Sequence, residues 1–279
     1  MKIIAESSST RTEWALVDGE SIVEHAYTQG LNPYFQSRRE ISHSIRLELP
    51  EAFFRRRWEH VYFYGAGCAN PEKTKIIQSS LIAQFKTPVT VYSDLLGAAR
   101  GILGNESGIA CILGTGSNSC LYDGKDIVAH VRPLGFILGD EGSGAYLGKM
   151  FVSDCLKNIA PAELRDAFYA SVSLQPDEIM DAVYTNPHPN RSLSTFSRFL
   201  VGHLADEYVY QLVYNAFLRF FTRNVAAYDY RSNQICCVGA TGCIFESVLR
   251  HVAADFGVEI RKIERTSLPG LVMYHAANG

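Results

Sequence analysis

The sequence lacks the patterns that mark a metal-binding or disulfide-stapled protein. Its seven cysteines are odd in number, and none forms the CxxC or Cys/His spacing that holds zinc or an iron–sulfur cluster. Two of them, Cys236 and Cys237, are adjacent in an apolar segment that we expect to be a buried strand. Reduced thiols in a cytoplasmic protein fit this pattern best.

Long apolar runs and an excess of charge of one sign are also missing. No segment approaches the ~18 apolar residues of a membrane-spanning helix, and the start, MKIIAESSS, is too short an apolar run for a signal peptide. The 26 basic and 29 acidic residues leave a net charge of −3, so neither nucleic acid nor an anionic membrane is an expected partner. The 279 residues, 47% of them hydrophobic, are enough for two domain cores.

A short pattern occurs twice at a constant offset of 105. Residues 15–30 (ALVDGESIVEHAYTQG) align with residues 120–135 (CLYDGKDIVAHVRPLG), and seven of the 16 aligned pairs are identical. Each copy has an Asp-Gly pair between two apolar segments, which predicts a β-hairpin. Two similar hairpins could arise by chance, but unrelated segments of this length share only about one identity. The repeat therefore favours two similar half-molecules that close on one ligand.

The repeat continues downstream at a larger offset. Residues 61–68 resemble residues 235–243, and in both copies a helical stretch and a further strand-like segment follow, at offsets between 171 and 174. The jump in offset predicts an insertion of nearly 70 residues in the second copy, at about 142–232. This region reads as helical over Gly144–Ile159, Pro161–Ser171, Asp177–Tyr184 and a long stretch from Leu193 to about Asp229, with a loop at Asn186–Asn190.

Alternating strand-like and helix-like segments predict an α/β protein. In the first copy, strands are expected at 2–6, 14–18, 21–28, 60–64 and 89–93, and helices at 72–85 and 95–103. We expect two β-β-β-α-β-α domains, at 1–105 and 106–279, with the insertion in the second. A C-terminal helix at about 268–279 is expected to pack back on the first domain.

Small and hydroxyl-bearing residues gather at matching turns of the two copies. The first turn is Glu6–Thr12 (ESSSTRT), and the second is Leu113–Asn118 (LGTGSN). Small residues let backbone amides approach a phosphate group, and hydroxyls add hydrogen-bond donors. Either turn alone is ordinary hairpin sequence. Two of them at equivalent positions of a duplication favour phosphate binding.

Two acidic positions lie near these turns. Asp94 follows a strand-like run and precedes a helix, which is where open α/β sheets bind ligands, although it could also cap that helix. Asp140 and Glu141 lie among the glycines of residues 135–144. Acids there complement a helix dipole, yet glycine weakens a helix start, so we favour ligand binding.

Residues 238–242 (VGATG) form another strand-to-helix turn on which a nucleotide could rest.

Together these residues resemble the acetate and sugar kinase, heat-shock protein and actin superfamily, whose duplicated ribonuclease-H-like (actin-like ATPase) fold holds ATP between two domains. Within it, the chain is similar to the N-acetylglucosamine kinase branch, grouped with the BadF/BadG-type ATPases. The most specific pieces are LGTGSN at 113–118 and LGDEGS at 138–143, supported by Ser93-Asp94 and by Gly30–Asn32. The resemblance implies an ATP- and Mg²⁺-dependent kinase of an amino sugar, with N-acetylglucosamine as the first choice.

The resemblance also implies roles for individual residues. Asp94 matches the catalytic base, and Glu6 would contact Mg²⁺ through water. The positions that match sugar-binding residues are Asn32, Asn118 and Asp140. The positions that match nucleotide-binding residues are Thr10, Arg11, Gly114, Thr115, Gly116, Ser117, Gly239 and Ala240.

The chain departs from its relatives at two places. Ser7-Ser8-Ser9 replaces a run of three glycines, and Pro133-Leu134-Gly135 replaces Gly-Trp-Gly.

Two alternatives to the kinase stay open. One is a BadF-type ATPase that acts on a protein partner, although the chain shows no matching pair of cluster-ligating cysteines. The other is a non-catalytic sensor of sugar or nucleotide. A homodimer is compatible with each.

Overall fold

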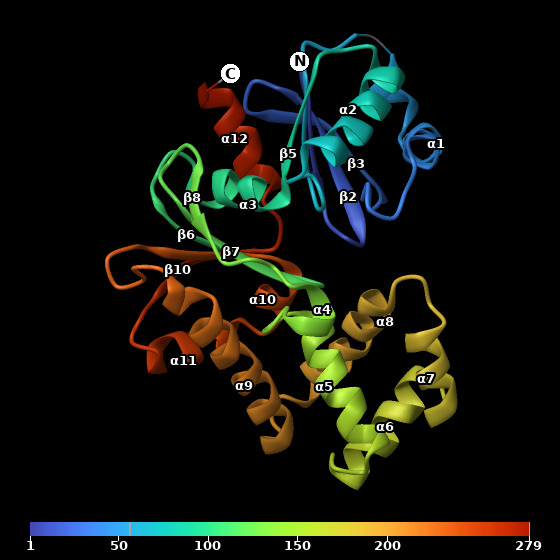
Figure 1. Cartoon of the computed structure of the whole chain (residues 1–279), viewed down its shortest axis with the longest axis vertical. Coiled ribbons are helices and arrows are strands. Elements are labelled where there is room, and N and C mark those ends of the chain that lie inside the picture. The colour runs from blue at the N-terminus through green and yellow to red at the C-terminus, as the bar shows by residue number, and fades with distance from the viewer. Residues whose placement is uncertain (56, 279) are drawn as a thin grey trace. The chain divides into compact units, whose positions relative to one another are not determined.

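The computed structural model describes residues 1–55 and 57–278 and contains two five-stranded sheets of the same strand order (Figure 1). The first sheet runs β3-β2-β1-β4-β5 and the second β8-β7-β6-β9-β10. Each begins with an antiparallel meander and continues with strands reached through helices. This repeated order confirms the duplicated α/β fold that the sequence predicted.

The strands of the first sheet are β1 (Lys2–Ser7), β2 (Arg11–Asp18), β3 (Ser21–Gln29), β4 (Val61–Gly65) and β5 (Val89–Ser93). Those of the second are β6 (Gly108–Leu113), β7 (Ser117–Tyr122), β8 (Ile127–His130), β9 (Ile235–Val238) and β10 (Ile260–Glu264). The α-helices are α1 (Arg38–Glu48), α2 (Pro71–Phe85), α3 (Asp94–Leu103), α4 (Gly135–Leu138), α5 (Gly144–Leu156), α6 (Ala162–Val172), α7 (Pro176–Tyr184), α8 (Pro189–Phe196), α9 (Glu207–Arg223), α10 (Ala240–Ile244), α11 (Glu246–Asp255) and α12 (Leu268–Asn278).

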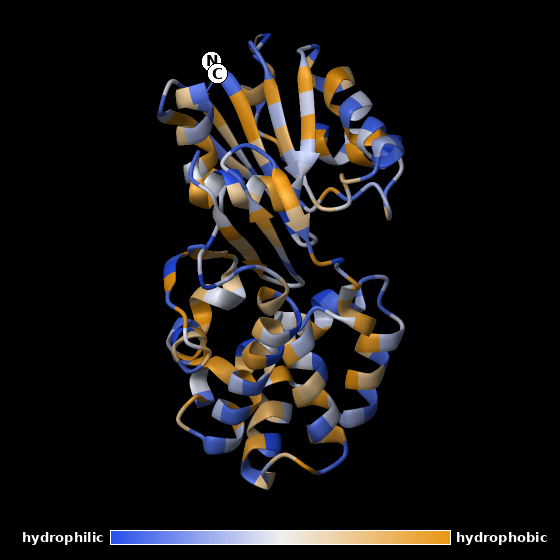
Figure 2. Ribbon diagram, turned by 60° about the vertical axis from the view of Figure 1, so that its left-hand side comes forward, coloured by the Kyte–Doolittle hydropathy of each residue, from blue (hydrophilic) through white to orange (hydrophobic). Residues whose placement is uncertain are grey.

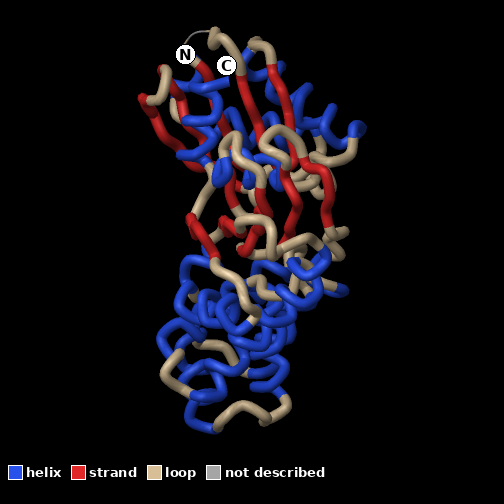
Figure 3. The backbone as a smooth tube through the Cα atoms, turned by 90° about the vertical axis from the view of Figure 1, so that its left-hand side faces the viewer, coloured by secondary structure: helices blue, strands red, loops and turns tan. Residues whose placement is uncertain are grey.

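The chain forms two compact units. Unit 1 comprises residues 1–110, 122–128 and the segment from Thr266 onward, and unit 2 comprises residues 111–121 and 129–265. Unit 1 thus contains the whole first sheet together with the C-terminal helix α12. Unit 2 contains the helical insertion, which Figure 3 shows as helices joined by loops.

The sheet of unit 1 buries both of its faces. Successive side chains of a strand point to opposite faces, so Ile3 and Ala5 of β1 pack with the apolar residues of α1 and α2, whereas Ile4 packs with those of α12. In Figure 2 the strands of this sheet carry long hydrophobic stretches, while the helices alternate between hydrophobic and hydrophilic residues. A sheet covered on both faces holds its strand ends rigidly, and this positions the loops described below.

Several helices differ from the sequence prediction. Helix α1 lies outside the helix ranges given above, and a capping box between Ser37 and Glu40 starts it. The expected long helix from Leu193 is wrong, because α8 ends at Phe196 and α9 begins only after Asp206. The Asp206 side chain accepts the amides of Tyr208 and Val209 and so caps a new helix.

All seven cysteines are free, and six of them are buried. Within the described ranges, no helix is both long and apolar enough to cross a membrane.

Candidate active site

Three parallel strands of unit 1 end at the same level. Ser7 of β1 pairs with Gly65 of β4, and Gly65 pairs with Ser93 of β5. The loops that follow these strands therefore emerge side by side at the carboxyl edge of the sheet, where α/β folds bind ligands. The predicted site residues of unit 1 lie at or next to this edge: Glu6, Thr10, Arg11, Asn32 and Asp94.

Asp94 is the first residue of α3, but it is not the residue that caps this helix. Ser93 is the N-cap, and its hydroxyl accepts the amide of Leu96 at 3.2 Å. The Asp94 carboxylate accepts the adjacent amide of Leu95, at 2.9 Å. Burial, together with the nearby charge of Glu6, raises the pKa of Asp94 to about 6. A carboxyl group that is partly desolvated and not needed for capping is suited to proton transfer.

Glu6 shares a hydroxyl group with a second carboxyl group. The Thr266 Oγ1 atom lies 2.7 Å from Glu6 Oε2 and 2.9 Å from Glu13 Oε2. The single hydroxyl proton of Thr266 is therefore shared between two carboxyl groups. Glu13 Oε1 also lies 2.8 Å from His25 Nε2, and burial raises the pKa of Glu6. The amide of Ser267, just before α12, also donates to Glu6 Oε2, at 2.9 Å.

In the first phosphate-type loop, a serine satisfies the loop's own backbone amides. The Ser8 hydroxyl accepts the amides of Thr10 at 3.3 Å and of Arg11 at 3.4 Å. Gly30 packs against this turn, because a Cβ atom there would lie 2.5 Å from the carbonyl oxygen of Ser8. The exposed Arg11 side chain lies over the ring of Tyr27. The Ser8 hydroxyl therefore occupies two of the backbone amide donors of this loop.

Asn32 is held at the same edge by its own turn. Its Oδ1 atom accepts the amide of Tyr34 at 3.0 Å, and its backbone amide donates to Gln36 Oε1 at 2.8 Å. Gly67 has a φ of +78°, and a Cβ atom there would lie 2.7 Å from Asn32 Oδ1. A glycine is thus required beside Asn32, and the Nδ2 group is oriented by an anchored Oδ1.

The second phosphate-type loop, in unit 2, differs from the first because its tip is not satisfied internally. The Gly114 carbonyl accepts the Gly144 amide and the Thr241 hydroxyl, both at 2.8 Å, and the Thr115 carbonyl accepts the Ala145 amide at 3.1 Å. The carbonyls are thereby fixed. In the part of the chain that the structure describes, the amides of Thr115 and Gly116 donate no hydrogen bond. Fixed carbonyls and free amides suit an anion.

Gly239 lies directly against this loop. Its φ is +130°, and a Cβ atom there would lie 2.3 Å from the Leu113 carbonyl oxygen and 3.0 Å from the Gly114 amide nitrogen. Its own amide donates to the Glu264 carbonyl at 2.8 Å. The structure thus brings together Gly239, Ala240 and the loop 114–117. Sequence reasoning did not single out Thr241, whose hydroxyl contact with Gly114 depends on the tertiary fold.

Asp140 reaches the same loop, and neither acid of its segment caps α5. The Asp140 carboxylate accepts the Ser117 amide, and a Cβ atom on Gly116 would lie 3.0 Å from Asp140 Oδ2. Burial raises the pKa of Asp140 to about 6. Glu141 instead pairs with Arg223 Nε at 2.6 Å. The cap of α5 is Ser143, which accepts the Tyr146 amide.

Asn118 follows the loop at the start of β7. Its Oδ1 atom accepts the Ser119 amide at 2.9 Å. This hydrogen bond orients the side-chain amide and leaves its Nδ2 group as the remaining donor. The predicted residues thus form two groups, one in each unit.

The whole chain is similar to solved structures of other proteins. A candidate N-acetylglucosamine kinase from Porphyromonas gingivalis is 40% identical, with a TM-score of 0.96, and the match covers 100% of this chain and 99% of that one. A candidate N-acetylglucosamine kinase from Chromobacterium violaceum is 17% identical, with a TM-score of 0.76 and 98% of both chains covered. A ROK family glucokinase from Streptomyces griseus, solved with glucose and AMPPNP, is 14% identical, with a TM-score of 0.59, and 100% of this chain and 99% of that one are covered. No protein-family model and no curated sequence matches the chain.

Proposed function

Because the chain belongs to the N-acetylglucosamine kinase family, we propose that it transfers the γ-phosphoryl group of ATP to a hydroxyl group of an amino sugar. N-Acetylglucosamine is the first candidate substrate, and glucosamine and N-acetylmuramic acid are close alternatives. The observation that carries the proposal is Asp94, which sits at the carboxyl edge of the sheet, is not needed as a cap and has a pKa raised to about 6.

The proposed reaction needs one proton acceptor and several positioned donors. The sugar hydroxyl attacks the γ-phosphorus atom, the bond from that phosphorus to the bridging oxygen of ADP breaks, and Asp94 takes the hydroxyl proton. The free amides of Thr115 and Gly116 would hold phosphate oxygens, and Gly239 and Ala240 would border the adenosine. Most of the rate enhancement then comes from positioning and charge stabilisation.

Three side chains are proposed to hold the sugar. Asn32 and Asn118 each present an amide group whose oxygen is already anchored, so the remaining NH₂ group can donate to a sugar hydroxyl. Asp140 supplies an acceptor beside the loop 114–117. Donors and acceptors fixed in this way select hydroxyl groups by position.

Magnesium fits the described residues only in a water-mediated role. No cluster of three or more His, Cys, Asp or Glu residues in the described ranges is arranged to hold a metal ion. Glu6 Oε2 is taken by Thr266 and Ser267, so Glu6 Oε1 is the atom we assign to a water molecule on the ion. When bound, magnesium neutralises charge on the phosphate oxygens, and it commonly retains several waters.

The direct test is ADP release measured with and without amino sugars. We expect release that depends on the sugar, together with a product heavier than the sugar by one phosphoryl group in mass spectrometry. Release that is independent of sugar would instead indicate an ATPase of the BadF type. Binding of sugar or nucleotide without any release would indicate a sensor and contradict the kinase proposal.

A second prediction concerns the first loop. Replacing Ser8 by glycine removes the hydroxyl that accepts the Thr10 and Arg11 amides, and these donors become available to a phosphate group. One hydrogen bond contributes about 0.5–1.5 kcal/mol, so affinity for AMPPNP should rise about 2- to 12-fold. Titration calorimetry measures this change.

The variant Ser8→Ala is the matched control, because it removes the same hydroxyl but keeps the Cβ atom. A gain in Ser8→Gly alone would show that close backbone approach is what limits binding. Unchanged affinity in both variants would mean that these amides do not face the nucleotide.

A further inference from the structure

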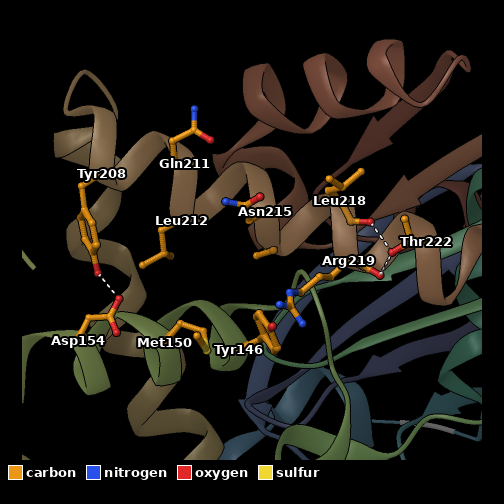
Figure 4. A pocket seen from close by; sticks show the side chains of 11 residues that line it. Tyr146, Met150, Asp154, Tyr208, Gln211, Leu212, Asn215, Leu218, Arg219 and Thr222 are labelled. Atoms are coloured by element: carbon orange, nitrogen blue, oxygen red, sulfur yellow. Dashed lines mark hydrogen bonds between the residues drawn. The ribbon is translucent and has the colours of Figure 1, made fainter. Parts of the chain in front are cut away.

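Unit 2 contains a groove that none of the assigned site residues lines. It has a volume of about 740 Å³ and lies between α5 and α9 (Figure 4). This volume is in the range of small-molecule sites, about 300–1,000 Å³. Its principal side chains are Tyr146, Met150 and Asp154 from α5, and Tyr208, Asn215 and Arg219 from α9.

Helical spacing produces the groove. Tyr146, Met150 and Asp154 are four residues apart, so they share one face of α5 and span about 12 Å. In Figure 4, Tyr208 lies opposite Asp154 at one end, and Arg219 lies beside Tyr146 at the other. A hydrogen bond of 2.7 Å from the Tyr208 hydroxyl to Asp154 Oδ2 closes the first end. The other end, beside Arg219, stays open and is positively charged.

That open end is cationic. Arg219 is exposed and forms no ion pair within the described residues. Lys149 does not line the groove, but its Nζ atom, which donates to the Phe136 carbonyl oxygen at 2.8 Å, lies 5.3 Å from the centre of the Tyr146 ring. The only carboxylate of the lining, Asp154, is at the far end and is held by Tyr208. A guanidinium group with free donors suits a phosphate or carboxylate group.

The rest of the lining suits a hydroxyl-rich body. Asn215 supplies an amide group on α9. Gln211 and Thr222 supply side-chain oxygens as acceptors, because Gln211 Nε2 donates to Glu207 and the Thr222 hydroxyl donates to backbone carbonyls of α9. Met150 and Leu212 supply an apolar strip. A sugar ring has hydroxyl groups around its rim and C–H groups on its faces, so it matches both kinds of surface. We propose that this groove is a second site, which binds a phosphorylated sugar with its phosphate group on Arg219.

The groove adjoins the loop that we assign to the nucleotide. Gly144 and Ala145, immediately before Tyr146, donate their amides to Gly114 and Thr115. A ligand that contacts Tyr146 therefore acts on the first turn of α5, which holds that loop. This places the groove where the product of a sugar kinase can influence the enzyme. The binding itself is independent of whether the kinase proposal is correct.

The experiment is titration calorimetry on the full chain without nucleotide, so that no turnover occurs. The probes are glucose 6-phosphate and N-acetylglucosamine 6-phosphate, compared with the unphosphorylated sugars and with inorganic phosphate. We expect the sugar phosphates to bind more tightly than either part alone. We also expect Arg219→Gln to weaken their binding at least tenfold and Asn215→Ala to weaken it less.

Two controls locate the binding. Lys157→Gln removes an exposed cation just after α5 that does not line the groove, and it should leave the affinity unchanged. Asp140→Asn alters the proposed sugar site, and it should also leave this affinity unchanged. The proposal is overturned if Arg219→Gln has no effect, if Asp140→Asn abolishes binding, or if inorganic phosphate binds as tightly as the sugar phosphates.

Discussion

Replacement of Asp94 by asparagine is expected to lower kcat by about 10²- to 10⁴-fold, the usual contribution of a general base. The amide keeps the size of the side chain but cannot accept the proton of the sugar hydroxyl. Affinity for AMPPNP should change little, because Asp94 is not among the groups assigned to the nucleotide. Sugar-dependent ADP release measures the first quantity, and calorimetry measures the second.

The pH dependence of the wild-type protein checks the same role. Asp94 must be ionised to act as a base, and its pKa is raised to about 6. We therefore expect kcat/KM to fall tenfold per pH unit below about 6 and to level off above it. A carboxyl group whose pKa is higher in the folded state than in the unfolded chain destabilises the fold as pH rises from the unfolded-state pKa to the folded-state pKa. Asp94→Asn should therefore not lower the free energy of unfolding at neutral pH.

Ser93→Ala is the matched control for this substitution. It removes the side chain that caps α3, so it should lower stability by about 1 kcal/mol but leave a base in place. If Asp94→Asn retains near-normal turnover, or if Ser93→Ala loses as much activity, Asp94 has only a structural role.

Gly270→Ala is expected to destabilise the protein by on the order of 3 kcal/mol, near the upper range of overpacking effects. The helices α3 and α12 touch through glycines, and a Cβ atom on Gly270 would lie 1.6 Å from the carbonyl oxygen of Gly101. The Gly101 carbonyl oxygen belongs to the backbone of α3, so it cannot move away as a flexible side chain would. Relief requires α12 to move, which would disturb the hydrogen bond between His275 and Tyr64. Urea denaturation measures the change in the free energy of unfolding.

Gly202→Ala provides the comparison, because a Cβ atom there meets nothing within 4 Å. Its effect should stay within about 0.5 kcal/mol. Equal effects of the two substitutions would mean that α3 and α12 do not approach this closely. Gly101→Ala is an independent check, since its Cβ atom would lie 2.5 Å from the Ser267 carbonyl oxygen.

The roles assigned to Asp94 and Asp140 illustrate how far sequence reasoning reaches. Each acid precedes or begins a helix, and either could have been a cap. The structure separates the two readings, because serine hydroxyls do the capping in both cases. Which of several neighbouring polar groups takes the helix amides depends on backbone dihedral angles, and these are not visible in the order of residues.

The sequence by itself determined the duplication, the place of the insertion and the candidate loops. It could do so because alternation, turn residues and a constant offset are local properties of the chain. Only the tertiary structure decided that Glu6 and Glu13 share the Thr266 hydroxyl, and that Arg219 faces a groove. These depend on side chains up to 260 residues apart in the chain, whose contacts form only when the sheets and helices pack.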